Sequence, residues 1–179
     1  NVIKKCNEKK ISVIPQGGNT SLVGGSVPLE NSKMLQIIIN FKKLNKIINL
    51  DPNSFSIQIE SGCILEDIQH FLSKKNFCFP LSIGSRGNCQ IGGNISSHAG
   101  GTNVIKYGTL RSNILGLEAV MADGSFFSSM KNVRKDNTGY DLKQLLIGSE
   151  GTLGLIKAAN IRVFPKPLET RVVFGTFSN

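Results

Sequence analysis

Tryptophan is absent from this chain of 179 residues, and aromatic residues together make up only 7% of it. A core must therefore be mainly aliphatic, and a hydrophobic fraction of 40% is enough to build one. The longest apolar runs, such as residues 34–39, have the length of a strand and are too short to cross a bilayer. No secretion signal opens the chain. The composition indicates a soluble globular protein of one domain or two small lobes.

Histidine and paired cysteines are also scarce. The chain has only two histidines, His70 and His98, and no C-x-x-C pair. A structural zinc site is therefore not expected. Widely spaced cysteines in such a chain indicate reduced thiols in a cytosol-like compartment, which means the cytoplasm, or the mitochondrial matrix if the source is eukaryotic. We expect buried, small apolar roles for the four cysteines, Cys6, Cys63, Cys78 and Cys89.

Acidic residues are outnumbered, and the formal net charge is +9. The lysines are scattered along the sequence and are not interleaved with aromatic residues. A nucleic-acid footprint would concentrate lysine and arginine on one face or groove. We therefore expect a solvated basic surface, with an acidic partner domain as a second possibility. A basic nucleic-acid-binding module remains the alternative of a different class.

Glycine, by contrast, is concentrated in two stretches, residues 15–25 (PQGGNTSLVGG) and residues 81–101 (LSIGSRGNCQIGGNISSHAGG). Glycine lets the backbone approach another molecule closely, and Ser, Asn and Thr supply short donors beside it. The longer stretch has almost nothing apolar to bury, so it cannot make a core, but Ile83, Ile91 and Ile95 recur in it as anchors. We therefore expect an anchored functional loop. Two such loops predict a ligand with phosphates and an extended body.

Apolar periodicity predicts strands at residues 11–14, 34–40, 46–50, 54–60, 114–122, 125–129 and 155–164. The run at 34–40 is almost continuously apolar, which is typical of a strand covered on both faces. Helices are expected at 2–10, 64–75 and 141–147, and Asp123-Gly124 is a hairpin signal.

The expected fold class is α+β, with one α/β lobe in residues 1–79. The glycine-rich loop and a second lobe follow in residues 80–167, and the ligand lies between the lobes. Because the chain begins with Asn1 and residues 171–177 read as a new strand, we expect residues 168–179 to start a further, C-terminal domain that is missing here.

Four segments carry a resemblance to a known family. In order they are PQGGNTSLVGGSVP, GSRGNCQIGGNISSHAGG, RKDNTGYDLKQL and IGSEGTLGLI. Together they resemble the PCMH-type FAD-binding domain of the vanillyl-alcohol oxidase flavoprotein family. The branch most resembled contains D-2-hydroxyglutarate dehydrogenase, D-lactate dehydrogenase and glycolate oxidase. The likeness extends over residues 11–167.

The resemblance implies FAD and names the residues that would bind it. The first segment resembles the pyrophosphate loop, the second the stretch along the phosphates and flavin, and the last the segment over the adenosine side. The implied cofactor-binding residues are Pro15, Gln16, Gly17, Gly18, Asn19, Thr20, Ser21, Gly84, Ser85, Arg86, Gly87, Asn88, Cys89, Gln90, Gly92, Gly93, Asn94, Ser97, His98, Ala99, Gly100, Glu150, Gly151, Thr152, Leu153, Gly154, Leu155 and Ile156.

The chain departs from the family at two places. Some relatives tether the flavin through a histidine in the first loop, where this chain has Asn19 and Thr20, so non-covalent FAD is implied. His98 stands where relatives often carry asparagine, and it either donates to a phosphate or caps a turn. For Cys89, a core thiol is favoured over addition to the flavin.

The implied activity is oxidation of a D-2-hydroxy acid to the 2-oxo acid, with the flavin carrying the chemistry. The implied partners are a small 2-hydroxy-acid substrate, an electron acceptor, the missing C-terminal domain and, as one assembly, a homodimer. No catalytic or metal-binding residue of this chain matches the family. The alternatives are a glycolate oxidase subunit or an enolpyruvyl reductase of the same fold, which would use a nicotinamide donor.

Overall fold

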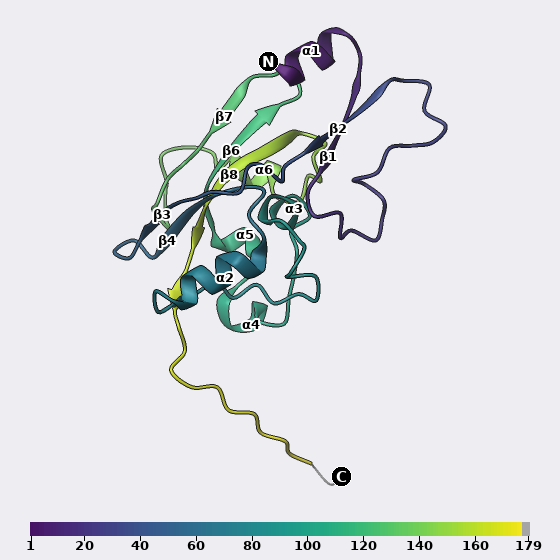
Figure 1. Ribbon diagram of the computed structural model, residues 1–179. Helices are drawn as coiled ribbons and strands as arrows, with labels where there is room; N and C mark the ends of the chain where they lie inside the picture. Colours follow the sequence, from purple (N-terminus) through teal and green to yellow (C-terminus); the bar gives the residue numbers. More distant parts are fainter. Residues whose placement is uncertain (177–179) are drawn as a thin grey trace.

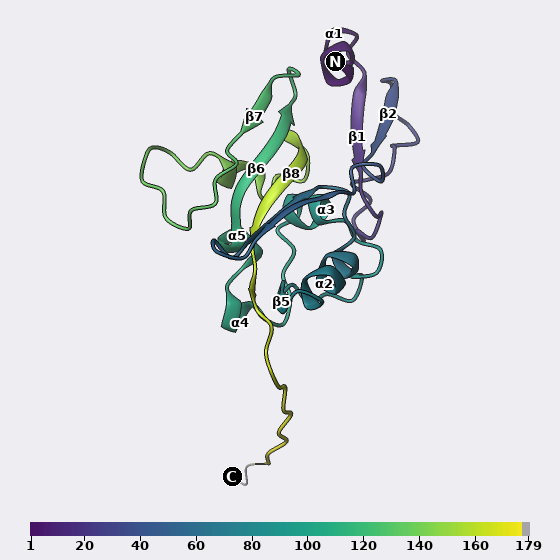
Figure 2. The ribbon, with the colours of Figure 1, turned by 60° about the vertical axis from the view of Figure 1, so that its left-hand side comes forward.

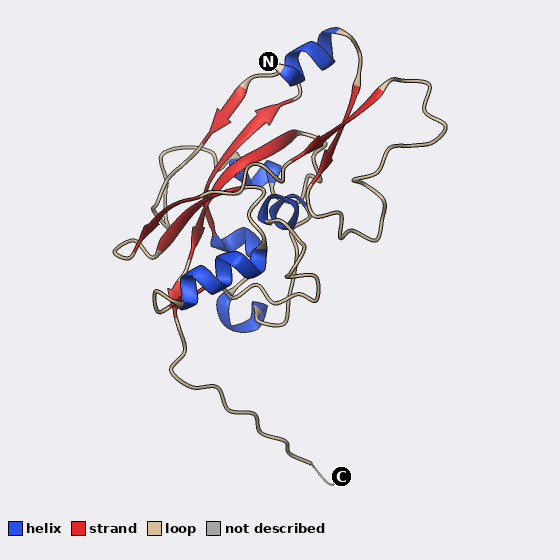
Figure 3. Ribbon diagram, in the orientation of Figure 1, coloured by secondary structure: helices blue, strands red, loops and turns tan. Residues whose placement is uncertain are grey.

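A five-stranded antiparallel sheet in the order β3-β4-β8-β6-β7 forms the larger part of the protein (Figures 1 and 3). The computed structural model describes residues 1–176. The sheet strands are β3 (Ile47–Asp51), β4 (Ser56–Glu60), β6 (Ile114–Met121), β7 (Phe126–Ser128) and β8 (Gly154–Arg162). Alternate apolar residues of β4, β6 and β8, such as Ile57, Leu117 and Ile161, are fully buried on one face of this sheet.

Helices cover that face. Helix α2 (Leu65–Ser73) buries a stripe of Leu65, Ile68 and Leu72, and α3 (Ile91–Ser96) buries Ile91 and Ile95, which lie one turn apart. Both helices join the same core cluster as the inward side chains of the sheet. Figure 2 shows α2 and α3 on one side of the sheet. The shorter helices are α1 (Val2–Glu8), α4 (Val104–Tyr107), α5 (Leu110–Asn113) and α6 (Lys143–Leu146).

A separate two-stranded parallel sheet lies on the far side of α3 from the large sheet (Figure 2). It pairs β1 (Ser12–Gln16) with β2 (Gln36–Asn40), and the segment between them projects as a long loop (Figure 1). A third small pair joins β5 (Phe77–Cys78) to β9 (Phe164–Pro165). No helix in residues 1–176 is long and apolar enough to cross a membrane.

The α+β class is confirmed, but the sheet does not follow the expected boundary at residue 79. Strands β3 and β4, from the expected first lobe, belong to the same sheet as β6, β7 and β8. The pairing of β4 with β8, in which Ile57 lies opposite Ile161, joins segments about a hundred residues apart. Such long-range pairing leaves no mark in local composition, so a division by chain order was wrong here.

The anchoring role expected for Ile91 and Ile95 is confirmed, but the prediction that residues 81–101 make no part of a core was wrong. This stretch contains α3, and four of its apolar residues, Leu81, Cys89, Ile91 and Ile95, belong to the core cluster, while Ile83 and Ala99 pack against it. The positions between them are mostly glycine and polar residues. A segment can therefore join a core with four well-placed side chains when its backbone packs closely against neighbours.

Two strand predictions also need correction. Strand β2 is not covered on both faces, because none of its side chains is fully buried and that of Ile38 is 45% exposed. No strand forms in residues 171–176, which have no ladder partner in the described part of the chain, and residue 177 lies outside it. The hairpin at Asp123-Gly124 is confirmed, with β6 and β7 antiparallel and Gly124 at a φ of 83°.

Candidate functional site

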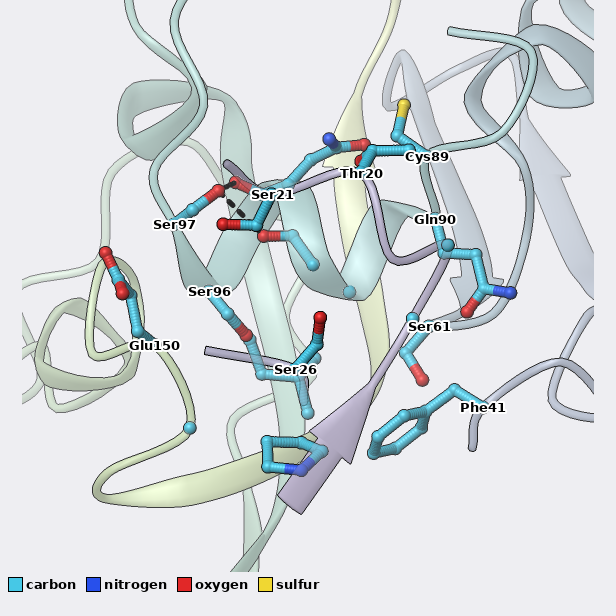
Figure 4. A pocket seen from close by; sticks show the side chains of 18 of the residues that line it. Thr20, Ser21, Ser26, Phe41, Ser61, Cys89, Gln90, Ser96, Ser97 and Glu150 are labelled. Carbon is cyan, nitrogen blue, oxygen red and sulfur yellow. Dashed lines mark hydrogen bonds between the residues drawn. The ribbon is translucent and has the colours of Figure 1, made fainter. Parts of the chain in front are cut away.

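A cavity of about 300 Å³ lies where the end of β1, the start of β8 and α3 come together. Its lining is mostly glycine and small polar residues (Figure 4). A volume of this size lies at the lower end of the range typical of small-molecule sites. The cavity therefore gathers the glycine-rich segments that are far apart in the sequence.

One wall of the cavity is formed by residues 17–21, the loop that follows β1. Within the described residues, the backbone N–H groups of this loop donate no hydrogen bond. Asn19 has a φ of 52°, in the left-handed region, and Ser26 Oγ donates to Asn19 Oδ1 at 2.7 Å. Left-handed residues in a loop can turn successive N–H groups to one side and form an anion-binding nest. This loop therefore has unused donors available for an anion.

Gly18 fixes how closely the first loop approaches the second glycine-rich stretch. A Cβ at Gly18 would lie 1.9 Å from the carbonyl oxygen of Asn88, a distance that no side chain tolerates. Gln16 holds the loop from the other side, because its Nε2 donates to the carbonyl oxygen of Ser26 at 3.0 Å and its Oε1 accepts from Asn40 Nδ2 at 3.1 Å. The loop is thus anchored although its amides are unused.

The turn at residues 84–90, unlike residues 17–21, uses several of its backbone groups in hydrogen bonds. The amides of Asn88 and Cys89 both donate to the carbonyl oxygen of Ser85 at 2.9 Å. The carbonyl oxygens of Arg86 and Cys89 in turn accept from Glu66 N and Leu65 N, both at 3.1 Å. These bonds cap the start of α2, which has no side-chain cap. This turn therefore fixes α2 in place and has fewer unused amides for a ligand.

Helix α3 forms the floor of the cavity and ends in a Schellman motif. His98 N donates to Ile95 O at 3.0 Å, and Ala99 N donates to Asn94 O at 2.8 Å. His98 occupies the left-handed position of this motif, with a φ of 49°, where glycine is usual. The His98 side chain does not line the cavity, so of the two roles expected for it the structure favours the turn cap.

The turn at residues 148–154 closes the cavity near β1. Gly151 has a φ of 81°, and a Cβ there would lie 2.7 Å from Pro15 Cγ, so glycine permits this approach. Arg111 holds the preceding segment by donating to Gln144 O at 2.6 Å and to Ile147 O at 2.5 Å. Figure 4 shows the Glu150 side chain on the opposite side of the cavity from Phe41, Ser61 and Gln90.

The cavity is nearly free of charge although the chain is strongly basic. Among its described lining residues, Glu150 is the only charged one. Arg86, the one cation of the two glycine-rich stretches, lies outside the lining, and its Nε is 3.2 Å from Glu66 Oε1. Exposed pairs of this kind contribute little to stability. The cavity therefore offers neutral donors rather than cations.

Thiols and metal ligands do not add reactive groups here. Burial raises the pKa of the Cys63 thiol to about 11, so that thiol stays protonated at neutral pH. Cys89 lines the cavity but is only 2% exposed and packs in the core. Within residues 1–176, no three His, Cys, Asp or Glu side chains are grouped so that they could hold a metal ion.

Most of the predicted site residues meet at this cavity. Those that line it are Pro15, Gly17, Gly18, Asn19, Thr20, Ser21, Ser85, Cys89, Gln90, Gly92, Gly93, Asn94, Ser97, Ala99, Glu150, Gly151, Gly154, Leu155 and Ile156. Those that do not are Gln16, Gly84, Arg86, Gly87, Asn88, His98, Gly100, Thr152 and Leu153.

Sequence reasoning missed six lining residues, Gly25, Ser26, Phe41, Ser61, Ile83 and Ser96. Gly25, Ser26 and Ser96 lie inside the recognised segments and could have been included. Ser61 and Phe41 follow strands β4 and β2 and belong to no recognised segment. Their place in the site comes from the packing of these strand ends, which local sequence does not reveal.

Comparisons with known proteins show which family this chain resembles. Residues 1–129 match a protein family described as FAD binding domain. The chain is 47% identical over 173 residues to the mitochondrial D-2-hydroxyglutarate dehydrogenase of Danio rerio, covering 97% of this chain and 32% of that protein. It is 44% identical to the D-2-hydroxyglutarate–pyruvate transhydrogenase of Saccharomyces cerevisiae, covering 99% of this chain and 35% of that protein.

Solved structures show the same fold. Alkyldihydroxyacetonephosphate synthase, in two crystal forms, superposes with a TM-score of 0.83 at 23% identity, covering 94% of this chain and 30% of that one. The chain spans about a third of the length of the curated relatives it matches. The comparisons therefore concern one part of these longer proteins.

Proposed function

This chain belongs to the family of FAD-binding domains, and from that premise we propose that it is the FAD-binding part of an enzyme that oxidises a D-2-hydroxy acid to the 2-oxo acid. D-2-hydroxyglutarate and D-lactate are the proposed substrates. The observation that carries the proposal is the cavity, which is lined by neutral donors and by a loop whose amides are unused. It is supported by the similarity of the chain, at 44–47% identity, to enzymes named for D-2-hydroxyglutarate.

The cavity residues fit FAD by their chemistry. The free amides of residues 17–21, with the hydroxyls of Thr20 and Ser21, suit a pyrophosphate, which only accepts hydrogen bonds. Gly93 lies in the lining, and a Cβ added to it would meet no atom within 4 Å, so a ligand can approach its backbone. When bound, FAD would accept the hydride removed from C2 of the substrate.

We propose that FAD is held without a covalent bond. The cavity lining contains no histidine or tyrosine among the described residues, and Cys89 is buried in the core. Acid precipitation of the holoprotein should leave the yellow colour in the supernatant. Colour that stays in the pellet would contradict this part of the proposal.

The substrate carboxylate needs a cation, and no arginine or lysine lines the cavity among the described residues. We propose that the carboxylate-binding cations, the base and any metal ligands come from a C-terminal domain of the full-length enzyme. The electron acceptor, a homodimeric assembly, and a place in the cytoplasm or in the mitochondrial matrix of a eukaryote belong to the same proposal.

The test is anaerobic reduction of the flavin in the full-length enzyme. D-2-hydroxyglutarate or D-lactate should bleach the flavin absorbance, while the L-enantiomers should not. Bleaching by glycolate alone would favour a glycolate oxidase subunit. Bleaching by NADPH alone would overturn the proposal in favour of an enolpyruvyl reductase.

A further inference from the structure

The segment between β1 and β2 carries a concentration of exposed apolar side chains. Residues 22–35, the apolar loop, contain six large apolar residues, and all six are exposed: Leu22 (101%), Val23 (79%), Val27 (49%), Leu29 (73%), Met34 (51%) and Leu35 (68%). Single exposed apolar residues are normal on a protein surface, but a group of them marks a site of interaction. Figure 1 shows the loop projecting away from the rest of the protein.

Polar contacts, rather than apolar packing, hold the apolar loop in its shape. Gln36, at the start of β2, clamps the main chain of Leu29 by accepting from its amide at 3.0 Å and donating to its carbonyl oxygen at 2.8 Å. Ser32 Oγ accepts from Met34 N and donates to Met34 O, each at 3.1 Å. These bonds preorganise the backbone and leave the apolar side chains available to a partner.

The apolar loop is continuous with the wall of the cavity. The nearby residues that line the cavity are Thr20, Ser21, Gly25 and Ser26. None of the six apolar residues lines it. Ser26 connects the two parts, because its Oγ donates to Asn19 Oδ1 at 2.7 Å. A partner that covers the apolar side chains would therefore lie at the rim of the cavity.

The composition of the apolar loop favours a permanent and apolar partner. Glu30 and Lys33 are the only charged residues in 22–35. The cores of protein interfaces are depleted of charge, and permanent interfaces are more apolar than transient ones. An acidic partner would instead be attracted to exposed lysines elsewhere on the chain, such as Lys42 and Lys43.

The rest of a full-length polypeptide fits this description better than a second copy of this chain. The chain spans about a third of the length of its curated relatives, so most of a protein of that length lies outside it. A projecting loop also needs a groove to receive it. Apart from the glycine-lined cavity, the other well-formed cavity of residues 1–176 lies beside Leu110 and measures about 20 Å³, which is room for about one water molecule.

We propose that the apolar loop is the surface onto which the C-terminal part of the full-length polypeptide docks, and that an apolar groove of that part buries the six side chains. The proposal rests on the proposed function, which assigns the carboxylate-binding cations to the same C-terminal part. That part must reach the rim of the cavity to bring its cations to the substrate. The apolar loop offers the contact that would hold it there.

Two residues of nearly equal exposure allow a matched labelling test in the full-length holoenzyme. Leu22 is 101% exposed and Tyr140 is 95% exposed in this chain. The loop that follows β7 and carries Tyr140 lies on the other side of the large sheet from β1 and β2 (Figure 2). Leu22→Cys should react with a maleimide about a hundredfold more slowly than Tyr140→Cys, because a covered thiol reacts only when the interface opens. Equal rates would overturn the docking.

The same labelling identifies what covers Leu22. Protection that is lost when FAD is removed would assign the contact to the cofactor, and protection that is lost on dilution to the monomer would assign it to a second copy. Either result would overturn the proposal. Labelling needs no substrate, so it still measures docking if hydroxy acids fail to reduce the flavin, a failure that would count against the proposed function instead.

A second pair of variants measures the consequence for turnover. Leu29 is 73% exposed and Leu145 is 63% exposed, and Leu145 lies in α6, outside both the apolar loop and the cavity lining. Leu29→Asp would place a charge in the interface and should lower kcat/KM for the hydroxy acid about tenfold while the flavin content stays normal. Leu145→Asp should change neither quantity. An unchanged kcat/KM in Leu29→Asp would overturn the docking.

Discussion

The two glycine-rich segments have similar compositions but opposite internal bonding. In residues 17–21 the backbone amides are unused within the described residues, whereas the turn at 84–90 uses its amides and carbonyls to build itself and to cap α2. Residues 91–96 then form a helix with buried Ile91 and Ile95. Glycine thus serves ligand approach in one segment and close packing in the other. Composition alone does not distinguish these roles.

Gly92 and Gly93, which are adjacent in α3, show the same contrast between close packing and ligand approach. A Cβ at Gly92 would lie 2.6 Å from Ser61 Cβ, whereas a Cβ at Gly93 would meet no atom within 4 Å. Gly92 is buried and Gly93 is exposed, although both line the cavity. We therefore expect Gly92 to serve packing and Gly93 to serve ligand approach.

The largest effect is expected from Gly92→Ala. The added methyl group would displace Ser61 and its strand, which should lower the free energy of unfolding by about 2 kcal/mol and the melting temperature by roughly 4–8 °C. Thermal melting of the apoprotein measures this. Gly93→Ala is the matched control, and its melting temperature should equal or exceed that of the wild type, because alanine loses less entropy than glycine in a helix. Equal melting temperatures for Gly92→Ala and Gly93→Ala would show that the close approach of Gly92 to Ser61 does not limit the size of the residue at position 92.

Gly93→Val should have the next largest effect, this time on the ligand. The side chain has room in the apoprotein, so the melting temperature should be kept. It would enter the space of the cofactor and lower the affinity for FAD by up to about a hundredfold. Gly175→Val, also with no neighbour within 4 Å but outside the cavity, is the control. Normal flavin content in Gly93→Val would mean that FAD does not approach this helix.

The smallest effect is expected from His98→Gly. Glycine relieves the left-handed backbone at the end of α3 but loses more entropy on folding, so the free energy of unfolding should rise by about 0.5 kcal/mol. The affinity for FAD should not change, because the His98 side chain does not line the cavity. Weaker FAD binding in this variant would instead show that the His98 side chain contacts FAD.

The sequence predicted features that depend on local pattern. Alternation gave the strand around Ile57, and Asp123-Gly124 gave the hairpin, because the turn between β6 and β7 needs a residue that tolerates positive φ, which is Gly124. The glycine-rich segments predicted most of the cavity lining. These features are encoded within a few residues of where they act.

Features that depend on distant partners could not be predicted. The β4–β8 pairing invalidated the expected lobe boundary, and it also sets where Ser61 lies. Arg86 was the one cation expected near the phosphates, yet it pairs with Glu66 of α2. Four buried side chains were enough to draw residues 81–101 into the core. Each of these outcomes depends on packing between segments rather than on local sequence.

The central claim is that a cavity with no cation in its described lining, in a basic protein, binds FAD through backbone amides and uncharged side chains. Its most direct test is a titration of the apoprotein with FAD, followed by flavin fluorescence, at low salt and at about 0.15 M ionic strength. The Kd should change by less than about twofold, because short, partly buried contacts are screened little. Lys42→Ala with Lys43→Ala, which removes an exposed basic pair beside Phe41, should leave the Kd intact. A steep loss of affinity with salt, or with this double substitution, would contradict the claim and show that the basic surface holds the cofactor.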